Sequence, residues 1–496
     1  MLIHFGLCRR SNSEILLEWF SFARTAISYR RFDPKHIKLM IAPLVLLTVL
    51  WSKSSYATDY YVSPSGSDSN PGTEQLPFRN PQAAANVVNP GDTVFLMDGT
   101  YPGVGSDKRV LNLSRSGTPG NMITFRNYPG HRPQIGRLPP TKDDQYGFVL
   151  LGADNIRIEG LAFVGTEQKC LYIASNGING STNVEIIDNT FDQCGRAFVT
   201  NTLSDCQVDT GHDSINSGPY TNGTLIEGNV ITNSGRTINT ELCQQLGSTN
   251  DHEYRHDHAM YLKGANHIVR NNVILDHPAG LGIKIDGYSQ NIGEISAPFY
   301  SHIIINNTFG PNVSPQPYDG SSGHPVNPFN SSNAIPGGAY NPRYLIANNI
   351  FLEPINGTGG GAYTGSVLLQ SGQTWPGTPD CYNNISTGTK VQSTCSEHLA
   401  EFAVNVTSVD NVINETLGNL EFIDAPNDNY EIGATSSAIG AGNCAISAIT
   451  GDGRNAIPST DFNGNPRSPT TCDVGAFEHS SQQASRPMPP AFVNAN

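Results

Sequence analysis

The sequence predicts an all-β protein built as a parallel β-helix, in which one ribbon of short strands winds through many similar coils. Composition is the first indication, since the 496 residues include 50 Gly and 33 Pro and only 15% are charged. Such usage is typical of short strands joined by many turns rather than of helical bundles. The second indication is a degenerate motif that recurs through the middle of the chain. Repeats of roughly 20 to 50 residues are typical of solenoids.

The first 57 residues are interpreted as a leader and secretory signal peptide rather than as part of the fold. Basic residues between Arg30 and Lys38 precede an apolar run from Leu39 to Trp51, and Ala57 closes a Ser-Tyr-Ala tripeptide suited to signal peptidase. The run has 13 residues, fewer than the roughly 20 needed to span a bilayer. A membrane anchor is the alternative. We therefore expect an extracellular or periplasmic protein with no membrane span after cleavage.

The segment after the leader carries several short motifs. Residues 60–73 are rich in Ser, Gly, Asn and Pro, and Asn89-Pro90-Gly91-Asp92 and Asp98-Gly99-Thr100-Tyr101 follow. These motifs resemble the N-terminal cap and first coil of secreted right-handed parallel β-helix proteins, a group that holds several polysaccharide lyases. The Ala-rich stretch 81–88 is predicted to be a short capping helix over the end of the hydrophobic interior. Pro90-Gly91-Asp92 is predicted to be the turn into the first strand.

The middle of the chain repeats a motif of aliphatic residues, then Asn, then two residues of which the second is usually apolar; Ile304-Ile305-Asn306-Asn307-Thr308-Phe309 is one copy. The key positions of the seven copies are Gly160, Asn189, Asn229, Asn272, Asn307, Asn349 and Asn384. Two short strands on either side of a fixed turn residue favour coils stacked at about 4.8 Å. A β-sandwich with Asn-rich turns is the alternative interpretation.

The repeated Asn is expected to do two things at once. Its short amide tolerates the left-handed backbone conformation at a bend, and stacked Asn side chains can hydrogen-bond to one another as an Asn ladder. The spacing of the copies is irregular, so loops of different length should leave the other corners of the coils. Such loops on a rigid scaffold often carry binding sites.

The cysteines favour an oxidising compartment. Cys8 lies in the leader and the other eight form an even set, as expected of an exported protein. The sequence has no paired CxxC motifs, so it does not predict a structural zinc site. Neighbours along the sequence suggest four disulfides, although eight cysteines allow 105 connectivities: Cys170–Cys194, Cys206–Cys243, Cys381–Cys395 and Cys444–Cys472.

The predicted organisation is a β-helix with its cap over residues 58–413, a closing segment over 414–480 and a disordered tail over 481–496. Asp461-Phe462-Asn463-Gly464-Asn465 and Asp473-Val474-Gly475-Ala476-Phe477 resemble the closing segment of such β-helix proteins. That segment is expected to pack along the last coils or to cap them. The tail is rich in Ser, Gln, Pro and Ala, which argues against a packed structure.

The densest group of ionisable side chains lies between residues 252 and 286. If Met260 and Leu262 point inward, strand alternation sends Tyr261 and Lys263 outward, and the same rule sends Lys284 and Asp286 outward from the following strand. The two strands are offset by 23 residues, close to one coil without a loop. We therefore expect Tyr261 beside Lys284 and Lys263 beside Asp286 on one exposed face.

This group suits proton abstraction next to a uronate carboxylate, which needs a base and a cation or proton donor that stabilises the resulting charge. Lys263 or Lys284 could be the base, Arg255 could neutralise the carboxylate and Tyr261 could protonate the leaving oxygen. His256 and His258 are further catalytic candidates, but they share the inward parity of Met260, so buried, hydrogen-bonded histidines are the alternative.

Asp286, Asp257 and His277 are the candidate substrate-binding residues. An ordinary surface ion pair is the alternative for Lys263 and Asp286. No metal-binding motif is found, but Ca²⁺ is considered because it can bridge protein and uronate carboxylates. Asp143-Asp144 is the adjacent acidic pair that a glycosidase would use, and it is interpreted as a surface turn.

The function predicted from these features is a lyase or C5-epimerase acting on an acidic, extended polysaccharide. A noncatalytic polysaccharide-binding or cell-surface protein is the main alternative, and a glycoside hydrolase is the second. The net charge of −14 argues against binding to nucleic acid, because no excess of Lys and Arg can displace counterions. We expect the exported chain to be a monomer.

Overall fold

The computed structural model describes residues 57–196, 211–236, 242, 245–246, 257–277, 282–286, 299–310, 326–329, 343–352, 378–387, 407–412, 415–455 and 457–479. The predicted leader, apart from Ala57, and the predicted tail lie outside these residues. No helix among the described residues is long and apolar enough to cross a membrane.

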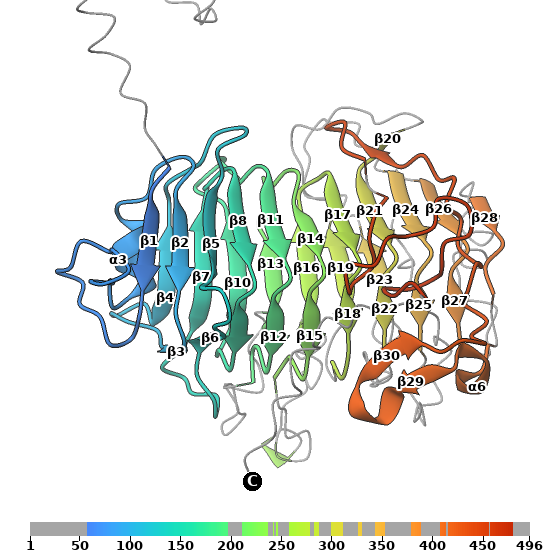
Figure 1. Cartoon of the computed structure of the whole chain (residues 1–496), viewed down its shortest axis with the longest axis horizontal. Coiled ribbons are helices and arrows are strands. Elements are labelled where there is room, and N and C mark those ends of the chain that lie inside the picture. The colour runs from blue at the N-terminus through green and yellow to red at the C-terminus, as the bar shows by residue number, and fades with distance from the viewer. Residues whose placement is uncertain are drawn as a thin grey trace, which may run out of the picture. The chain divides into compact units, whose positions relative to one another are not determined.

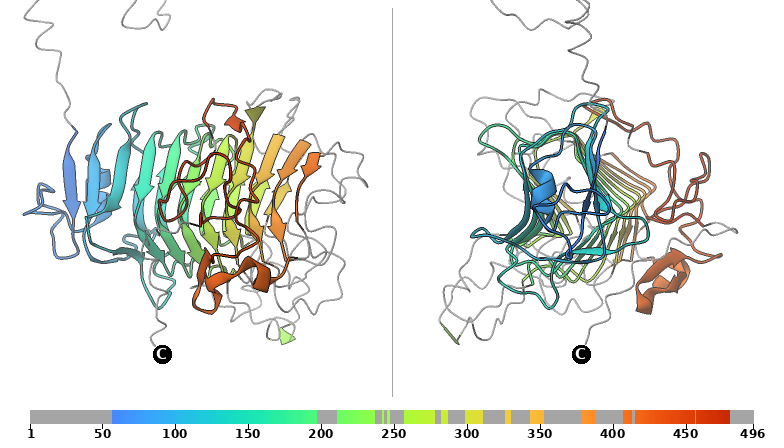
Figure 2. Two further views of the ribbon diagram at one scale, coloured as in Figure 1. Left: turned by 45° about the vertical axis from the view of Figure 1, so that its right-hand side comes forward. Right: turned by 60° about the vertical axis from the view of Figure 1, so that its left-hand side comes forward.

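The described strands form three long parallel sheets, which confirms the predicted parallel β-helix (Figure 1). We call these sheets A, B and C; their strands are given below. Each coil contributes one strand to sheet C, then one to sheet A and one to sheet B, as β7 (Tyr146–Leu151), β8 (Ile156–Glu159) and β9 (Ala162–Val164) do. The right-hand view of Figure 2 looks along the coils and shows the strands of successive coils lying over one another around a common interior.

Sheet A has eleven strands: β1 (Asp59–Val62), β2 (Thr93–Leu96), β5 (Ile123–Asn127), β8 (Ile156–Glu159), β11 (Val184–Ile187), β14 (Leu225–Glu227), β17 (His267–Arg270), β21 (His302–Ile305), β24 (Arg343–Ala347), β26 (Thr378–Tyr382) and β28 (Thr407–Val409). Sheet B has nine: β3 (Gly99–Tyr101), β6 (Pro133–Gly136), β9 (Ala162–Val164), β12 (Thr190–Asp192), β15 (Val230–Thr232), β18 (Val273–Ile274), β22 (Thr308–Phe309), β25 (Ile350–Phe351) and β27 (Ile385–Ser386). Sheet C has seven: β4 (Arg109–Leu113), β7 (Tyr146–Leu151), β10 (Lys169–Ala174), β13 (Ile215–Ser217), β16 (Met260–Lys263), β19 (Ile283–Asp286) and β23 (Val326–Phe329).

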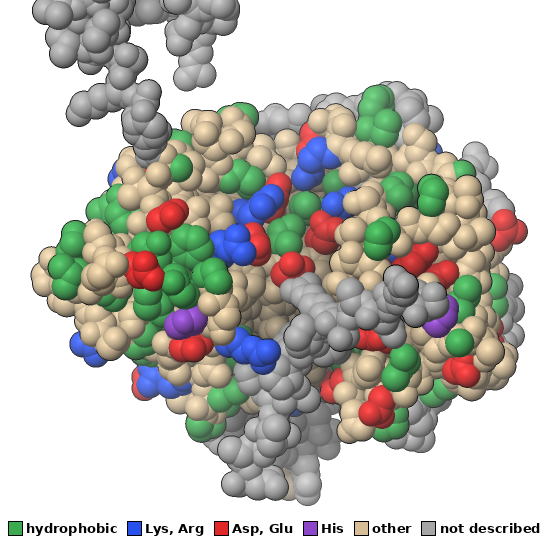
Figure 3. Space-filling view, viewed as in Figure 1, with side chains coloured by type: hydrophobic (Ala, Val, Ile, Leu, Met, Phe, Trp, Pro, Cys, Tyr) green, Lys and Arg blue, Asp and Glu red, His purple; other side chains and the backbone are tan. Residues whose placement is uncertain are grey.

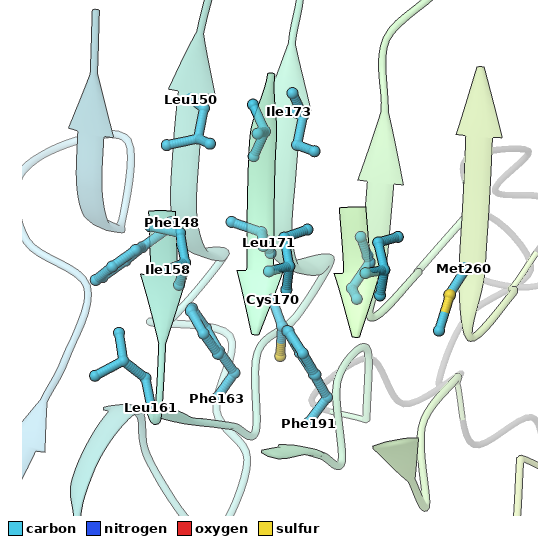
Figure 4. Close-up of a cluster of buried hydrophobic side chains, with 14 of the residues drawn as sticks. Phe148, Leu150, Ile158, Leu161, Phe163, Cys170, Leu171, Ile173, Phe191 and Met260 are labelled. Carbon is cyan, nitrogen blue, oxygen red and sulfur yellow. The ribbon is translucent and has the colours of Figure 1, made fainter. Parts of the chain in front are cut away.

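The interior is filled by columns of apolar side chains that repeat from coil to coil (Figure 4). Phe163 and Phe191 stack with ring centroids 4.9 Å apart, and Phe148 meets Phe163 edge to face at 5.2 Å. All three rings are fully buried. Alternation along each strand places one set of side chains here and the other set outside, so the inward columns fix which residues each sheet presents on its outer face.

The turn between sheets A and B holds the predicted Asn ladder. Asn229 donates its Nδ2 hydrogen to Oδ1 of Asn272 at 3.0 Å, and Asn272 donates in the same way to Asn307 at 3.0 Å. The ladder runs through Asn189, Asn229, Asn272, Asn307, Asn349, Asn384 and Asn411.

One part of the prediction for this turn was wrong. The ladder Asn does not adopt the left-handed conformation; the residue before it does, with φ of 53° at Asn271 and 55° at Asn306. Gly160, which was aligned with the ladder residues, belongs to this left-handed position, with φ of 67°. Bending and lateral hydrogen bonding are therefore divided between two adjacent residues.

The N-terminal end is closed as predicted, by a short helix. Helix α3 (Pro81–Ala85) buries Ala84 and Ala85 against the first coils. The interpretation of Asp143-Asp144 as a surface turn was wrong for Asp144, which is fully buried and accepts hydrogen bonds from Gly103 N and Arg137 Nε.

Two of the predicted disulfides, Cys170–Cys194 and Cys444–Cys472, are confirmed. Cys381 is also disulfide-bonded. Cys206, Cys243 and Cys395 lie outside the described residues.

The closing segment packs back along the outer faces of sheets A and B. It contains α6 (Leu417–Leu420), β29 (Phe422–Asp424), the 3₁₀ turn η4 (Ala425–Asn427), β30 (Asn429–Ile432) and β31 (Ile449–Thr450), which pairs with β20 (Phe299–Tyr300). Its apolar residues form one cluster against sheet B and another against sheet A. The Nδ2 groups of Asn271 and Asn383 donate to backbone carbonyls of this segment.

From β5 to β17, the outer face of sheet A carries paired charges. Arg126 pairs with Glu159 at 3.1 Å, and Arg270 pairs with Glu227 at 2.8 Å. Figure 3, which shows this side of the molecule, has Lys and Arg side chains next to Asp and Glu side chains in the middle of the view. The cations on this face are therefore neutralised by neighbouring coils.

Candidate functional site

The predicted pairing of the two lysine-bearing strands is present on sheet C. Strand β16 pairs with β19 in parallel, with Tyr261 opposite Lys284 and Lys263 opposite Asp286. Met260 and Leu262 are fully buried, whereas Tyr261, Lys263 and Lys284 are half-buried. Tyr261, Lys263 and Lys284 therefore lie on the outer face of sheet C, on neighbouring coils.

The tyrosine ring is the centre of this group. Lys263 Nζ lies 4.5 Å from the centroid of the Tyr261 ring, and Lys284 Nζ lies 5.1 Å from it. The His258 ring meets the same ring edge to face, with centroids 5.3 Å apart. Two ammonium groups on one aromatic ring are held by cation–π attraction. Two lysines of neighbouring coils thus share one tyrosine ring on the outer face of sheet C.

The backbone of Lys263 is fixed from both sides. Ser217 Oγ accepts a hydrogen bond from Lys263 N at 2.8 Å and donates one to Lys263 O at 2.8 Å. The buried His267 ring also contacts Lys263 O, with Nε2 at 2.9 Å. Because these contacts come from the preceding coil and from β17, the position of the Lys263 side chain is set by the scaffold and not by a loop.

Two buried aspartates brace the coils beneath this face. Asp257 Oδ1 accepts a hydrogen bond from His212 N at 3.0 Å, and Asp213 Oδ1 accepts one from His258 N at 2.9 Å. Each carboxylate therefore reaches across to the backbone of the neighbouring coil. Asp257 also forms a fully buried ion pair with Arg236, with Nη2 to Oδ1 at 2.8 Å.

The environments of the two carboxyl groups differ. Burial raises the pKa of Asp213 to about 6, although Lys169 and the hydrogen bond from Asn216 act in the opposite direction. Burial also acts to raise the pKa of Asp257, but the charge of Arg236 outweighs it, and the pKa is lower than usual. The Arg236 charge thus favours the ionised form of Asp257, which acts as a structural group.

Lys169 adds a third cation to this region. Its Nζ donates to Gly211 O at 2.8 Å and lies 5.6 Å from the centroid of the Tyr172 ring. Burial lowers the pKa of Lys169, while the charges of Asp213 and Asp257 act to raise it. Strongly perturbed groups gathered at one place are typical of functional sites.

The structure places the remaining predicted residues as follows. His258 is buried, as the alternative interpretation expected, yet its ring contacts Tyr261. Asp257 and His277 are both fully buried, and His277 Nε2 contacts Asp257 O at 3.1 Å. This burial argues against direct contact of Asp257 or His277 with a substrate. Arg255, His256 and the side chain of Asp286 lie outside the described residues.

Sequence reasoning missed Lys169, Tyr172, Asp213 and Asn216. Tyr172 pairs with Asn216, and Asn216 pairs with Tyr261, so these residues occupy the same outward column as Tyr261. The inward–outward alternation of Leu171-Tyr172-Ile173 could have revealed Tyr172. Lys169 is the first residue of β10, and Asp213 lies just before β13, at coil corners where the spacing of the repeats is irregular.

The described carboxyl groups near the site do not fit Ca²⁺, which prefers six to eight oxygen ligands. The Asp257 carboxylate is occupied by Arg236, and that of Asp213 accepts hydrogen bonds from Asn216 and His258 beside Lys169. No group of three or more His, Cys, Asp or Glu side chains that could hold a metal occurs in the described part of the chain.

Residues 60–228 match the family model described as "Pel9A-like, right handed beta helix region". A segment of 71 residues is 46% identical to the Uncharacterized protein YwoF of Bacillus subtilis and covers 14% of each chain. A segment of 90 residues is 34% identical to Pectate lyase PEL9 of Emericella nidulans and covers 18% of this chain and 21% of the relative. The chain thus matches well under two thirds of the length of these relatives.

Solved structures with similar coordinates include a rhamnogalacturonan lyase, with a TM-score of 0.48, 15% identity and coverage of 77% of this chain and 96% of the other. Another is pectate lyase Pel9A, with a TM-score of 0.36, 16% identity and coverage of 86% and 97%. The family model and the sheet topology together confirm the expected resemblance: residues 60–228 form a Pel9A-like, right-handed β-helix region.

Proposed function

We propose that this protein is an exported carbohydrate-active enzyme that cleaves an acidic polysaccharide by β-elimination at the outer face of sheet C. The observation that carries the proposal is the register of β16 and β19, which brings Lys263, Tyr261 and Lys284 together on one outer face. The Pel9A-like match and the pectate lyase relative support it.

The chemistry assigned to the three side chains is a proton transfer followed by bond cleavage. One lysine, as the free amine, takes the proton from C5 of a uronate, next to its carboxylate. The ammonium group of the other lysine neutralises the charge that develops on that carboxylate. The C4–O bond then breaks, a C4–C5 double bond forms, and the Tyr261 hydroxyl gives its proton to the leaving oxygen. A C5-epimerase would use the same first step and return a proton to the opposite face.

The acidic character of the whole chain does not oppose this proposal, because three lysines are gathered on sheet C around the site. Lys169, Lys263 and Lys284 all lie on the same sheet, and the Asp257 charge beneath them is neutralised by Arg236. Focused local fields, rather than net charge, guide a charged ligand to a site.

Hydrolysis is a weaker candidate. A glycosidase needs two carboxyl groups that flank the scissile bond. Among the described residues of this region, Asp213 and Asp257 are both fully buried and are hydrogen-bonded to the scaffold. Neither carboxyl group is placed to contact a sugar.

The test is to incubate the purified protein with pectate, alginate and glycosaminoglycans, with and without Ca²⁺, and to follow the ultraviolet absorbance of the unsaturated product. Lys263→Ala and Lys284→Ala should each abolish product formation while the circular dichroism spectrum is unchanged. Arg157→Ala is the matched control, because it removes an exposed cation, paired with Glu185, from sheet A. Full activity of both lysine variants would overturn the proposal. Retained binding without any product would favour a noncatalytic polysaccharide-binding protein.

Export is part of the proposal. The predicted signal peptide, the two described disulfides and a substrate that occurs outside cells agree with one another. Expression of the full chain with mass spectrometry of the secreted product tests it, and cleavage after Ala57 is the expected result.

A further inference from the structure

A second row of cations and aromatic rings lies on sheet C, on the coils before the candidate site. Arg109 on β4 pairs with Tyr146 on β7, and Tyr146 pairs with Lys169 on β10. All three side chains are half-buried. Neither Arg109 nor Tyr146 has a role in the chemistry proposed above.

The contacts within this row alternate between charge and ring. Arg109 Cζ lies 5.3 Å from the centroid of the Tyr146 ring, and the Tyr146 ring stacks on the Tyr172 ring at 6.3 Å. Lys169 Nζ then lies 5.6 Å from the centroid of Tyr172. The row is therefore continuous from β4 to β10, and Tyr172 pairs onward with Asn216 in the column that leads to Tyr261.

The charge of Arg109 is not neutralised within the described part of the chain. No ion pair joins its guanidinium to a carboxylate there, although a buried Nε without a hydrogen-bond partner is a feature that Arg109 shares with Arg126 and Arg270. On sheet A, by contrast, Arg126, Arg157 and Arg270 all pair with glutamates of neighbouring coils. A guanidinium without a carboxylate partner can donate paired hydrogen bonds to a carboxylate of a ligand.

Glu167 is an acidic group close to this row. Glu167 acts on the ring of Tyr146, but its pKa is raised by burial despite the nearby charges of Lys142 and Lys108. The row begins next to the N-terminal cap. Gln82 of α3 exchanges hydrogen bonds with the backbone of Asn112, at 2.7 and 3.1 Å, and Asn112 lies on β4, the strand that also carries Arg109.

We propose that Arg109, Tyr146, Tyr172 and Lys169 form a distal subsite that binds carboxylate groups of the same polyuronide chain, several sugars away from the bond that is cleaved. This inference rests on the proposed function. Four strand steps separate β4 from β16, which is roughly 19 Å at ~4.8 Å per step. An extended pyranose is about as long as one coil is thick, so Arg109 lies roughly four sugars from Tyr261, and Lys169 and Tyr172 on β10 lie roughly two sugars from it. Arginine donates two parallel hydrogen bonds to a carboxylate, and the tyrosine rings give a surface against which sugar rings pack.

The experiment compares Arg109→Ala with wild type on a long polyuronide and on trimers of the same sugar. Trimers bound at Tyr261 are too short to reach Arg109. For the polymer, KM should rise roughly tenfold, the loss expected for one charge-assisted contact, while kcat is unchanged. For trimers both constants should match those of wild type. Arg126→Ala removes a similarly exposed arginine from sheet A and should change neither substrate.

Direct binding separates the two proposals. If wild type cleaves the polymer and Arg109→Ala behaves like Arg126→Ala, the distal subsite is overturned while the lyase assignment stands. If no polyuronide is cleaved, affinity electrophoresis in gels that contain polyuronide still tests the subsite. Retardation of wild type that is lost in Arg109→Ala supports the subsite without the lyase, and an absence of retardation overturns it.

Discussion

Replacement of Asn272 by alanine tests the stacking of the coils that the candidate site requires. Asn272 is fully buried in the middle of the Asn ladder. Its Oδ1 accepts hydrogen bonds from Asn229 N at 2.9 Å and Asn229 Nδ2 at 3.0 Å. Its Nδ2 donates to Asn307 Oδ1 at 3.0 Å and to backbone carbonyls of Ile226 and Arg270, both at 2.9 Å.

The magnitude follows from the donor that alanine would leave without an acceptor. The backbone N–H of Asn229 loses its acceptor, and a buried unsatisfied donor costs about 1–3 kcal/mol. The Nδ2 group of Asn229 keeps the carbonyls of Ile186 and Glu227 as acceptors. Asn307 Oδ1 keeps its second donor, the backbone N–H of residue 272, so it contributes little. We expect a loss of about 2 kcal/mol of unfolding free energy.

The assay is urea denaturation followed by circular dichroism, with Asn121→Ala as the control. Asn121 is exposed, and the free energy of unfolding of that variant should stay within about 0.5 kcal/mol of wild type. Because a solenoid can unfold in steps, hydrogen exchange of the amides around β14 and β17 is measured in parallel. A loss below about 1 kcal/mol in Asn272→Ala would refute the role given to the ladder.

Three further predictions concern groups around the site. Burial lowers the pKa of His267 to about 4. The contribution of the neutral ring to the free energy of unfolding is therefore complete above pH 6.5 and falls by about 3 kcal/mol as the pH is lowered to 4. NMR titration of the His267 ring should give a midpoint near pH 4, and a midpoint near pH 6.5 would contradict this. Arg236→Ala leaves Asp257 as an uncompensated buried charge and should lower the free energy of unfolding by about 3–5 kcal/mol; a thermal midpoint equal to that of wild type would be inconsistent with this ion pair. Replacing Cys170 and Cys194 by serine opens a disulfide with a sequence separation of 24 and should cost about 3 kcal/mol in urea denaturation; no change would count against its role.

The sequence was sufficient to predict the fold because the local signals agree with one another. The Asn motifs marked the turn between sheets A and B, and the apolar residues around them identified the inward columns. Strand alternation and an offset of 23 residues then predicted the pairing of Tyr261 with Lys284, which the register confirms. Each of these features can be recognised from the residues of one coil or of two successive coils.

The rest of the site depends on contacts between coils that no local pattern describes. Asp257 was predicted to bind substrate, but its partner Arg236 lies 21 residues away and turns it into a buried structural charge. Lys169 and Asp213 are separated by an irregular insertion, so their positions on sheet C could not be aligned in advance. The division of the Asn turn into a bending and a bonding residue also required coordinates.

The most direct test of the central claim is the loss of the C5 hydrogen of the substrate. Pectate and alginate are incubated in D₂O with wild type, Lys263→Ala, Lys284→Ala or Arg157→Ala, and the H5 resonance is followed by NMR. We predict loss of the H5 signal with wild type and Arg157→Ala and no loss with either lysine variant. Persistence of H5 with wild type on every polyuronide, or its loss with both lysine variants, would contradict the assignment of this face as the site of proton abstraction.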